Sequence, residues 1–352
     1  MSVGRSNDGR VPSRERRASI PGPAIRKTST STTGHACSEC RHSLAPLPPS
    51  EVRLTNTTRC RLRALRCAAL LATSLSLACA GATKGSVASD PDRKDWIDLF
   101  NGRNLDGWTA KIAKHEVGEN FGNTFRVVDG VIQARYDGYG GNYNAQFGHL
   151  YYDKPFSYYL VSTEYRFLGE LYPGAPSYTL RNSGIMIHSQ DPRTMPRDQN
   201  FPISIEDQLL GGLSNGRPRT TGNMCSPGTM VDFNGKPDTR HCINSTSKTY
   251  DGDQWVLSET LVLGDSIVKH IIDHDTVLVY THPRQAAGVV TGFDPKQLTE
   301  GKLLSSGFIA LQAEGHNVDF RNVRLLNLEG CMDPKNANYK RYYVKSNPAA
   351  CR

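Results

Sequence analysis

The stretch ISIEDQLLGG, residues 203–212, has the pattern of a β-strand with two different faces. Successive side chains of a strand point to opposite sides of the sheet, so Ser204, Glu206 and Gln208 are expected to share one face. The opposite face is mainly apolar, which predicts that it points into a core and that it carries Asp207 there. The neighbouring acids Glu206 and Asp207 therefore point in opposite directions and cannot act as a pair on one substrate.

Short runs of the same kind fill the chain from Trp96 onward and are separated by turns rich in Gly, Pro, Asn and Asp. The runs are TFRVVDGVIQA (124–134), SYYLVSTEYRFL (157–168), NSGIMIHSQ (182–190), ISIEDQLL (203–210), QWVLSETLVLG (254–264), SIVKHIID (266–273), TVLVYTH (276–282), GFIALQAE (307–314) and VDFRNVRLLNL (318–328). The weak helical pattern of residues 295–304 is an exception. This pattern predicts an all-β protein, a sandwich of the jelly-roll type. Residues 90–330 are long enough to form one domain around a single core.

The charge of the chain is unevenly distributed. The formal net charge is +8, but residues 1–89 hold 14 basic and 4 acidic residues, a net charge of +10. The remainder holds 28 basic and 30 acidic residues, a net charge of −2. The excess of positive charge lies outside the expected domain, so we expect no nucleic-acid partner for the folded part.

Residues 59–84 have the pattern of a secretory signal or a lipoprotein leader. Four arginines, at positions 59, 61, 63 and 66, precede an apolar segment at 67–78, and small residues surround Cys79. The apolar segment is too short for a permanent membrane span. We therefore expect export to the periplasm or the cell surface, with Cys79 as a candidate for lipidation that would tether the protein to a membrane.

The leader begins unusually far from residue 1. Residues 1–58 are rich in Arg, Ser and Pro and show no apolar periodicity. We interpret them as a disordered or mis-assigned extension, with the true start near Val52 or Leu54.

The expected domain and its tail hold four of the nine cysteines. An even number of cysteines in an exported domain favours disulfides, and proximity in sequence favours the pairs Cys225–Cys242 and Cys331–Cys351. Other connectivities of four cysteines stay open at this stage. With the second pair closed, the polar tail 331–352 would be strapped down.

Alternation along several strands places polar side chains on one face and apolar ones on the other. The candidate site residues chosen on this basis are Glu164, Arg166, His188, Glu206, Gln208, His270, Gln312 and Glu314. The simplest arrangement is one concave sheet lined by all of them. Such groups suit hydrogen bonding to sugar hydroxyls, proton transfer or cation binding, although each residue taken alone also fits an ordinary solvent-facing position.

Several segments resemble the 3-keto-disaccharide hydrolase family over residues 94–328. The segments are DWIDLFNGRNLDGW (95–108), FRVVDGVI (125–132), NSGIMIHSQDP (182–192), ISIEDQLLGG (203–212), TGN-C-PGT (221–229) and GFIALQAEGHNVDFRNVRLLNL (307–328). The resemblance implies a concanavalin A-like jelly roll and an enzyme that cleaves glycosides oxidised to a ketone at C3. It also supports a Cys225–Cys242 link. The sequence departs from the family at Asp207, where relatives carry an apolar residue, and at Glu314, where many carry histidine.

The mechanism that the resemblance implies needs a base at C2, an acid for the leaving oxygen and a group that stabilises the enolate. Glu206 is the candidate base and His188 the candidate acid or enolate stabiliser, and the two together could hold a divalent metal ion. The other residues of the candidate set would bind substrate: Glu164, Arg166, Gln208, His270, Gln312 and Glu314.

Two other functions fit the same sequence. A jelly roll serves lectin-like carbohydrate-binding modules as readily as enzymes, and it also serves structural domains. A glycosidase acting on unoxidised sugars would need a second carboxylate, from Glu164 or Glu314, beside Glu206.

Overall fold

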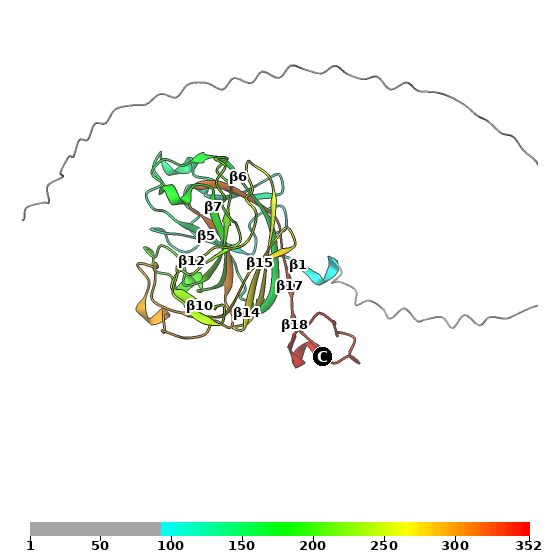
Figure 1. The fold of residues 1–352 in the computed structure, drawn as a ribbon. Helices are drawn as coiled ribbons and strands as arrows, with labels where there is room; N and C mark the ends of the chain where they lie inside the picture. The colour runs from blue at the N-terminus through cyan, green and yellow to red at the C-terminus, as the bar shows by residue number, and fades with distance from the viewer. Residues whose placement is uncertain (1–92) are drawn as a thin grey trace, which may run out of the picture. The chain divides into compact units, whose positions relative to one another are not determined.

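The computed structural model describes residues 93–352, which form an all-β sandwich (Figure 1). The strands are β1 (Trp96–Asp98), β2 (Trp108–Ile112), β3 (Phe125–Val128), β4 (Val131–Ala134), β5 (Gly148–Tyr152), β6 (Tyr158–Leu171), β7 (Asn182–Ser189), β8 (Ile205–Leu210), β9 (Asn223–Cys225), β10 (Thr229–Phe233), β11 (Lys236–Asp238), β12 (Cys242–Ile243), β13 (Val256–Leu263), β14 (Ile267–Ile272), β15 (Asp275–Gln285), β16 (Phe308–Ala313), β17 (His316–Asn327), β18 (Glu329–Gly330) and β19 (Lys345–Ser346). Short 3₁₀ helices lie at Arg93–Asp95, Phe121–Asn123, Asp137–Tyr139, Ser177–Thr179, Pro192–Thr194, Pro295–Gln297 and Pro348–Cys351.

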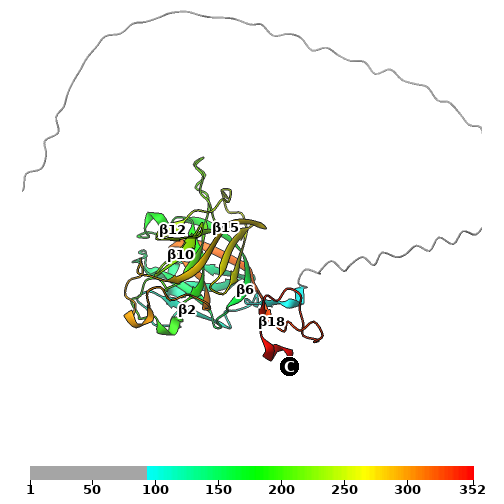
Figure 2. The same cartoon turned by 60° about the horizontal axis from the view of Figure 1, so that its bottom comes forward.

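Two antiparallel sheets make up the sandwich (Figures 1 and 2). The larger sheet has the order β11-β10-β15-β14-β13-β6-β17-β4-β3, with β1 also paired to β17. The smaller sheet has the order β12-β9-β8-β7-β16-β5-β2. Strands that are neighbours in a sheet are often distant in the chain, as β6 and β17 are. Packing of two antiparallel sheets around one core is the jelly-roll architecture that the sequence predicts, a concanavalin A-like sandwich.

The alternating runs found in the sequence become strands. The run 124–134 forms the hairpin β3–β4, and the run 203–210 forms β8. Alternation decides which residues of a run face the core, as in β13, where buried and half-buried residues alternate. The helical pattern at 295–304 yields only a single 3₁₀ turn, Pro295–Gln297, which follows the N-capping side chain of Asp294. In the described part of the chain, no helix is long and apolar enough to cross a membrane.

The C-terminal segment after β17 lies outside the sandwich, close to β1 and the end of β17 (Figures 1 and 2). An ion pair of 2.9 Å joins Lys340 to Asp95, and β18 pairs with β19 in parallel. A disulfide between Cys331 and Cys351 closes the segment, as the sequence predicts. Both this disulfide and the one between Cys225 and Cys242 are typical of an exported protein. Cys79, the leader 59–84 and the extension 1–58 lie outside the described residues.

Candidate active site

A cleft of about 440 Å³ lies on the outer face of the smaller sheet, the face turned away from the larger sheet. Strands β7, β8 and β9 supply its floor, and loops supply its walls. Its lining residues are Tyr178, Asn182, Phe201, Glu206, Gln208, Leu210, Arg219, Cys225, Pro227, His241, Cys242, Val289 and Glu314. The lining combines apolar side chains with a few converging polar groups, which is typical of a small-molecule site.

Glu206 occupies the floor of this cleft, as the alternation along β8 predicts. Its strand neighbours in the smaller sheet are Met186 of β7 and Cys225 of β9. The carboxyl group lies directly over Gly184, since a Cβ atom at that position would come within 2.5 Å of Glu206 Oε1. Glycine at 184 is therefore required for the close approach of the Glu206 side chain. Within the described residues, the Glu206 carboxyl group has no hydrogen-bond partner, which leaves it available to a ligand.

Glu314 lines the same cleft directly after β16. Of the neighbouring charged groups, it has the largest effect on the pKa of Glu206. The two side chains are 6% and 3% exposed, respectively. Burial raises the pKa of Glu206 well above its ordinary value, and the negative charges of Glu314 and Asp207 raise it further. Burial also raises the pKa of Glu314, to about 8. The cleft thus holds two interacting carboxyl groups whose pKa values are both raised, an arrangement found at sites of acid–base chemistry.

Gln208 and Gln312 lie on the same outer face as Glu206, as predicted. Gln208 lines the cleft, and its Oε1 accepts a hydrogen bond of 3.1 Å from Asn223 Nδ2. Gln312 is fully buried on β16, and neither of its side-chain polar atoms has a hydrogen-bond partner among residues 93–352. Four of the eight candidate residues, Glu206, Gln208, Gln312 and Glu314, are therefore brought to one surface.

His188 does not face Glu206, and the prediction that it acts beside this acid is wrong. Near His188 the pairing of β7 with β16 contains a bulge, because Phe308 pairs with Ser189 but Ala310 pairs with Met186. His188 itself has a left-handed backbone with φ of 48°. A bulge interrupts the alternation of faces, so the His188 ring turns inward and its Nε2 donates to Gly264 O at 2.9 Å. The predicted metal-ligand pair of Glu206 and His188 is therefore not formed.

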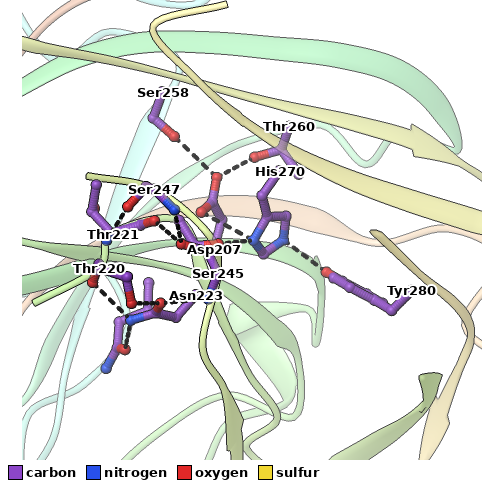
Figure 3. A network of polar contacts seen from close by, with 12 residues as sticks. Asp207, Thr220, Thr221, Asn223, Ser245, Ser247, Ser258, Thr260, His270 and Tyr280 are labelled. Carbon is purple, nitrogen blue, oxygen red and sulfur yellow. Dashed lines mark hydrogen bonds and ion pairs between the residues drawn. The ribbon is translucent and has the colours of Figure 1, made fainter. Parts of the chain in front are cut away.

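His270 also lies in the interior between the sheets, which corrects its assignment to the sugar-binding face (Figure 3). Its Nδ1 donates to Gly222 O at 3.0 Å and lies 3.2 Å from Asp207 Oδ1. Because a carbonyl oxygen only accepts, the proton is on Nδ1, and Nε2 accepts from Tyr280 Oη at 2.9 Å. The sequence held a signal for this placement, since His270 shares its strand face with the apolar Val268.

Asp207 points into the core, as its place on β8 predicts, and its partners come from the larger sheet. Its Oδ2 accepts hydrogen bonds from Ser258 at 3.0 Å and Thr260 at 2.6 Å, both on β13 (Figure 3). With His270, these hydroxyl groups compensate a fully buried carboxylate. The same strand thus carries one acid for the cleft and one that joins the two sheets.

Glu164 and Arg166 point outward, but from the larger sheet, so they cannot line the cleft. Glu164 is bound by Arg321 and Asn322, and Arg166 binds Asp319 at 2.9 Å. Alternation along β6 correctly separated these residues from the core. It could not show which of the two sheets β6 would join, because strand pairing is decided by contacts between distant segments.

Several cleft residues were missed by the sequence analysis. Tyr178 lies in the 3₁₀ helix Ser177–Thr179, and Arg219 and His241 lie in loops, where no periodic pattern marks them. His149 and Lys111 lie on neighbouring strands β5 and β2 and share the outer face with Gln312. Alternation within 108–112 and 148–152 was a usable signal for these two, because each is flanked by buried apolar residues.

The wall of the cleft is braced by the disulfide between Cys225 and Cys242, the predicted pair. It crosses the paired strands β9 and β12, with a Cα–Cα distance of 4.1 Å. His241 lies close enough to both sulfur atoms to suggest a metal site, with ligand atoms within 4.8 Å of one another. Metal ions bind the thiolate form of cysteine, so the disulfide excludes this set as a site while it is intact.

The sandwich and its acid-lined cleft define a jelly roll with a site for a small molecule. Residues 95–326 match the model of the 3-keto-alpha-glucoside-1,2-lyase-like domain, and the chain belongs to this family. The resemblance recognised in the sequence is thereby confirmed. No curated protein sequence matches the chain.

Solved structures with a similar fold include two proteins of Parabacteroides distasonis that are provisionally named glycosyl hydrolases. One is 17% identical, with 68% of this chain and 98% of that chain covered and a TM-score of 0.41. The other is 15% identical, with 66% and 99% covered and a TM-score of 0.40. A carbohydrate-binding module of Bacillus subtilis, of the type CBM66, is 12% identical, with 66% and 96% covered and a TM-score of 0.31.

Proposed function

We propose that this protein is an exported enzyme that cleaves 3-keto-glycosides by removal of the C2 proton, β-elimination and hydration. The observation that carries the proposal is the buried pair of acids, Glu206 and Glu314, in a cleft of about 440 Å³. Membership of the lyase-like family supports a glycoside as the substrate.

In the first step, Glu206 takes the proton from C2 of the substrate. A ketone at C3 acidifies this proton, because the electron pair left on C2 is delocalised onto the C3 oxygen as an enolate. A buried carboxylate is a stronger base than a solvated one, since burial favours its protonated form. The free carboxyl group of Glu206 over Gly184 is placed for such a transfer.

In the second step, the enolate collapses, the bond from C1 to the leaving oxygen breaks, and an enone remains. Glu314 is the proposed acid that protonates the leaving oxygen, because its raised pKa of about 8 keeps a proton available at neutral pH. It replaces His188 in this role. Water then adds across the C1–C2 double bond: the ionised Glu314 takes a proton from the water as its oxygen bonds to C1, and Glu206 returns its proton to C2.

The developing enolate needs hydrogen-bond donors around it. Gln208 lines the cleft, and with its Oε1 held by Asn223, its Nε2 group is a candidate donor. Arg219 adds a positive charge in the lining, and its guanidinium donates to Gly211 O at 2.7 Å. Should a divalent cation take part, its ligands would be the carboxylates of Glu206 and Glu314, because oxygen donors of this kind suit such ions.

The substrate assignment is tested by incubating the protein with a 3-keto-glucoside and with its unoxidised parent, each with and without EDTA. We expect cleavage of the ketone substrate alone, with products identified by mass spectrometry. Cleavage of the parent alone would identify a glycosidase that uses Glu206 and Glu314 as its two carboxylates. Loss of turnover with EDTA would establish the cation, and recovery on adding Mn²⁺ or Mg²⁺ would identify it.

The pH dependence of kcat/KM follows from the raised pKa values of both acids. Glu206 must be deprotonated and Glu314 protonated, so kcat/KM is expected to rise as Glu206 loses its proton and to fall as Glu314 loses its own above about pH 8. Replacing Glu314 with glutamine removes the group whose deprotonation causes the alkaline fall. The alkaline limb of the profile should therefore disappear in this variant while the maximum rate falls, because the proposed acid is lost.

Wild-type and Glu314→Gln profiles measured between pH 5 and 10 in one buffer series provide the comparison. Glu329→Gln, a change at an acid outside the cleft on β18, is the control and should leave the profile unchanged. An alkaline limb that persists at the same pH in Glu314→Gln would contradict the role of Glu314 as the acid.

A further inference from the structure

Beyond the acid pair, the outer face of the smaller sheet carries two buried polar side chains without a structural explanation. His149 on β5 is paired directly with Gln312 on β16. Their side chains are 1% and 0% exposed, respectively. Neither ring nitrogen of His149 and neither amide atom of Gln312 has a hydrogen-bond partner anywhere in residues 93–352.

Such burial is costly, since each unpaired polar group loses its contacts with water and gains none. Native proteins pair nearly all buried polar groups, so a cluster of unpaired ones on adjacent strands calls for a ligand. The nearby ammonium group of Lys111 is not a hydrogen-bond partner for either side chain. Its Nζ donates instead to Ile112 O, His115 O and Arg197 O.

The two side chains offer a pattern suited to hydroxyl groups. Burial lowers the pKa of His149 to about 3, with a smaller contribution from the charge of Lys111, so its imidazole is neutral. A neutral imidazole has one donor and one acceptor, and the Gln312 amide offers both kinds of group as well. Neighbouring sugar hydroxyls, each a donor and an acceptor, match this pattern.

The pair lies next to the cleft. In the smaller sheet, β16 is two strands from β8, and β5 is three strands from it. With about 4.8 Å between strands, His149 lies roughly 14 Å across the sheet from the strand of Glu206. Phe201, which lines the cleft, also packs against His149, with ring centroids 6.0 Å apart and planes at 76°. Phe201 therefore contacts both the cleft and His149.

We propose that His149 and Gln312 form an inner subsite of the cleft, beneath Phe201, that binds hydroxyl groups of a carbohydrate. This inference rests on the proposed function and deepens it, because it places the part of the substrate remote from Glu206. The ligand reaches the subsite when the Phe201 ring moves aside.

Another buried histidine makes a matched control. His316 is also fully buried with both nitrogens unpaired in the described part of the chain. Its ring packs at 5.7 Å against Phe167, which belongs to the core between the sheets, and it does not line the cleft. Unpaired nitrogens alone therefore do not define a site; the position on the outer face beside Gln312 does.

The test replaces each polar side chain with an apolar one of similar size, in the variants His149→Phe, Gln312→Met and His316→Phe. All three should keep or gain thermal stability, because an unpaired polar group is removed. Only His149→Phe and Gln312→Met should lower kcat/KM for a 3-keto-disaccharide, by about 10-fold each, the effect of a lost hydrogen bond to substrate. Calorimetric titration of maltose and of the 3-keto-disaccharide into the Glu206→Gln background should show the same weakening.

The outcomes separate this inference from the proposed function. Turnover and binding that change less than 2-fold in both variants, with an active wild type, would overturn the inner subsite alone. Weaker sugar binding without any turnover by wild type would support the subsite and reject the enzyme. A wild type that neither binds nor cleaves these sugars would overturn both. An equal loss of activity in His316→Phe would show a general effect on the fold and would also overturn the subsite.

Discussion

Replacing Glu206 with glutamine is expected to lower kcat on a 3-keto-glycoside by a factor of about 10²–10⁴, the usual contribution of a general base. Glutamine has nearly the same shape and keeps the close contact with Gly184, but it cannot accept the C2 proton. Steady-state kinetics with the ketone substrate measure the effect. Affinity for the sugar should change little, because the hydrogen-bonding capacity of the cleft is retained.

The same variant should be at least as stable as wild type, and more so at alkaline pH. The folded-state pKa of Glu206 lies above its ordinary value of 4.5, so this group contributes stability at low pH that is lost as the pH rises toward the folded-state value. Glutamine does not ionise, so the variant does not lose this stability as the pH rises. Thermal unfolding at pH 5 and pH 8 checks the sign. Unchanged turnover in Glu206→Gln would reject Glu206 as the base, whereas sugar binding without turnover by wild type would favour a non-catalytic binding module.

Replacing Asp207 with asparagine is the same acid-to-amide change one residue further on. It is expected to lower stability and to leave turnover largely unchanged. Its carboxylate accepts hydrogen bonds from Ser258 and Thr260 and lies 3.2 Å from the Nδ1 of His270. The amide group of asparagine would place a donor against the N–H of His270 or against the hydroxyl groups. Breaking a buried, charge-assisted network of this kind costs about 3 kcal/mol of unfolding free energy.

For a domain of this size, that cost corresponds to a decrease in Tm of roughly 6–12 °C. Thermal and denaturant unfolding of Asp207→Asn beside Glu206→Gln provide the measurement, with each variant serving as the other's control. Well below its Tm, Asp207→Asn should keep turnover within a few-fold of wild type. A stable Asp207→Asn protein would contradict the role of this residue in joining the two sheets.

These neighbouring acids show what the period of a strand can reveal. Side chains alternate with a period of two, so the apolar majority on one face of 203–210 is enough to send Asp207 inward and Glu206 outward. The same reasoning identified the strands of the sandwich and placed Gln208, Gln312 and Glu314 correctly. Proximity in sequence was enough for Cys225–Cys242 and Cys331–Cys351, because both pairs close short loops.

The predicted positions of four candidate residues were wrong, for different reasons. They are His188, His270, Glu164 and Arg166. The bulge at His188 depends on how β7 fits against β16, and a single extra residue reverses the face of a side chain. Glu164 and Arg166 point outward as predicted, yet from the other sheet. A sequence pattern gives the face of a strand but leaves its sheet undetermined.

The sequence by itself therefore determined the all-β class, the inward and outward faces of β8 and the acid most suited to chemistry, since these depend on local periodicity. Tertiary structure decided that Glu314 rather than His188 accompanies Glu206, and that burial raises the pKa values of both acids. It also brought His149 beside Gln312 from a segment more than a hundred residues away. Proximity and desolvation arise only when distant strands pair and loops cover the sheet, so no local pattern contains them.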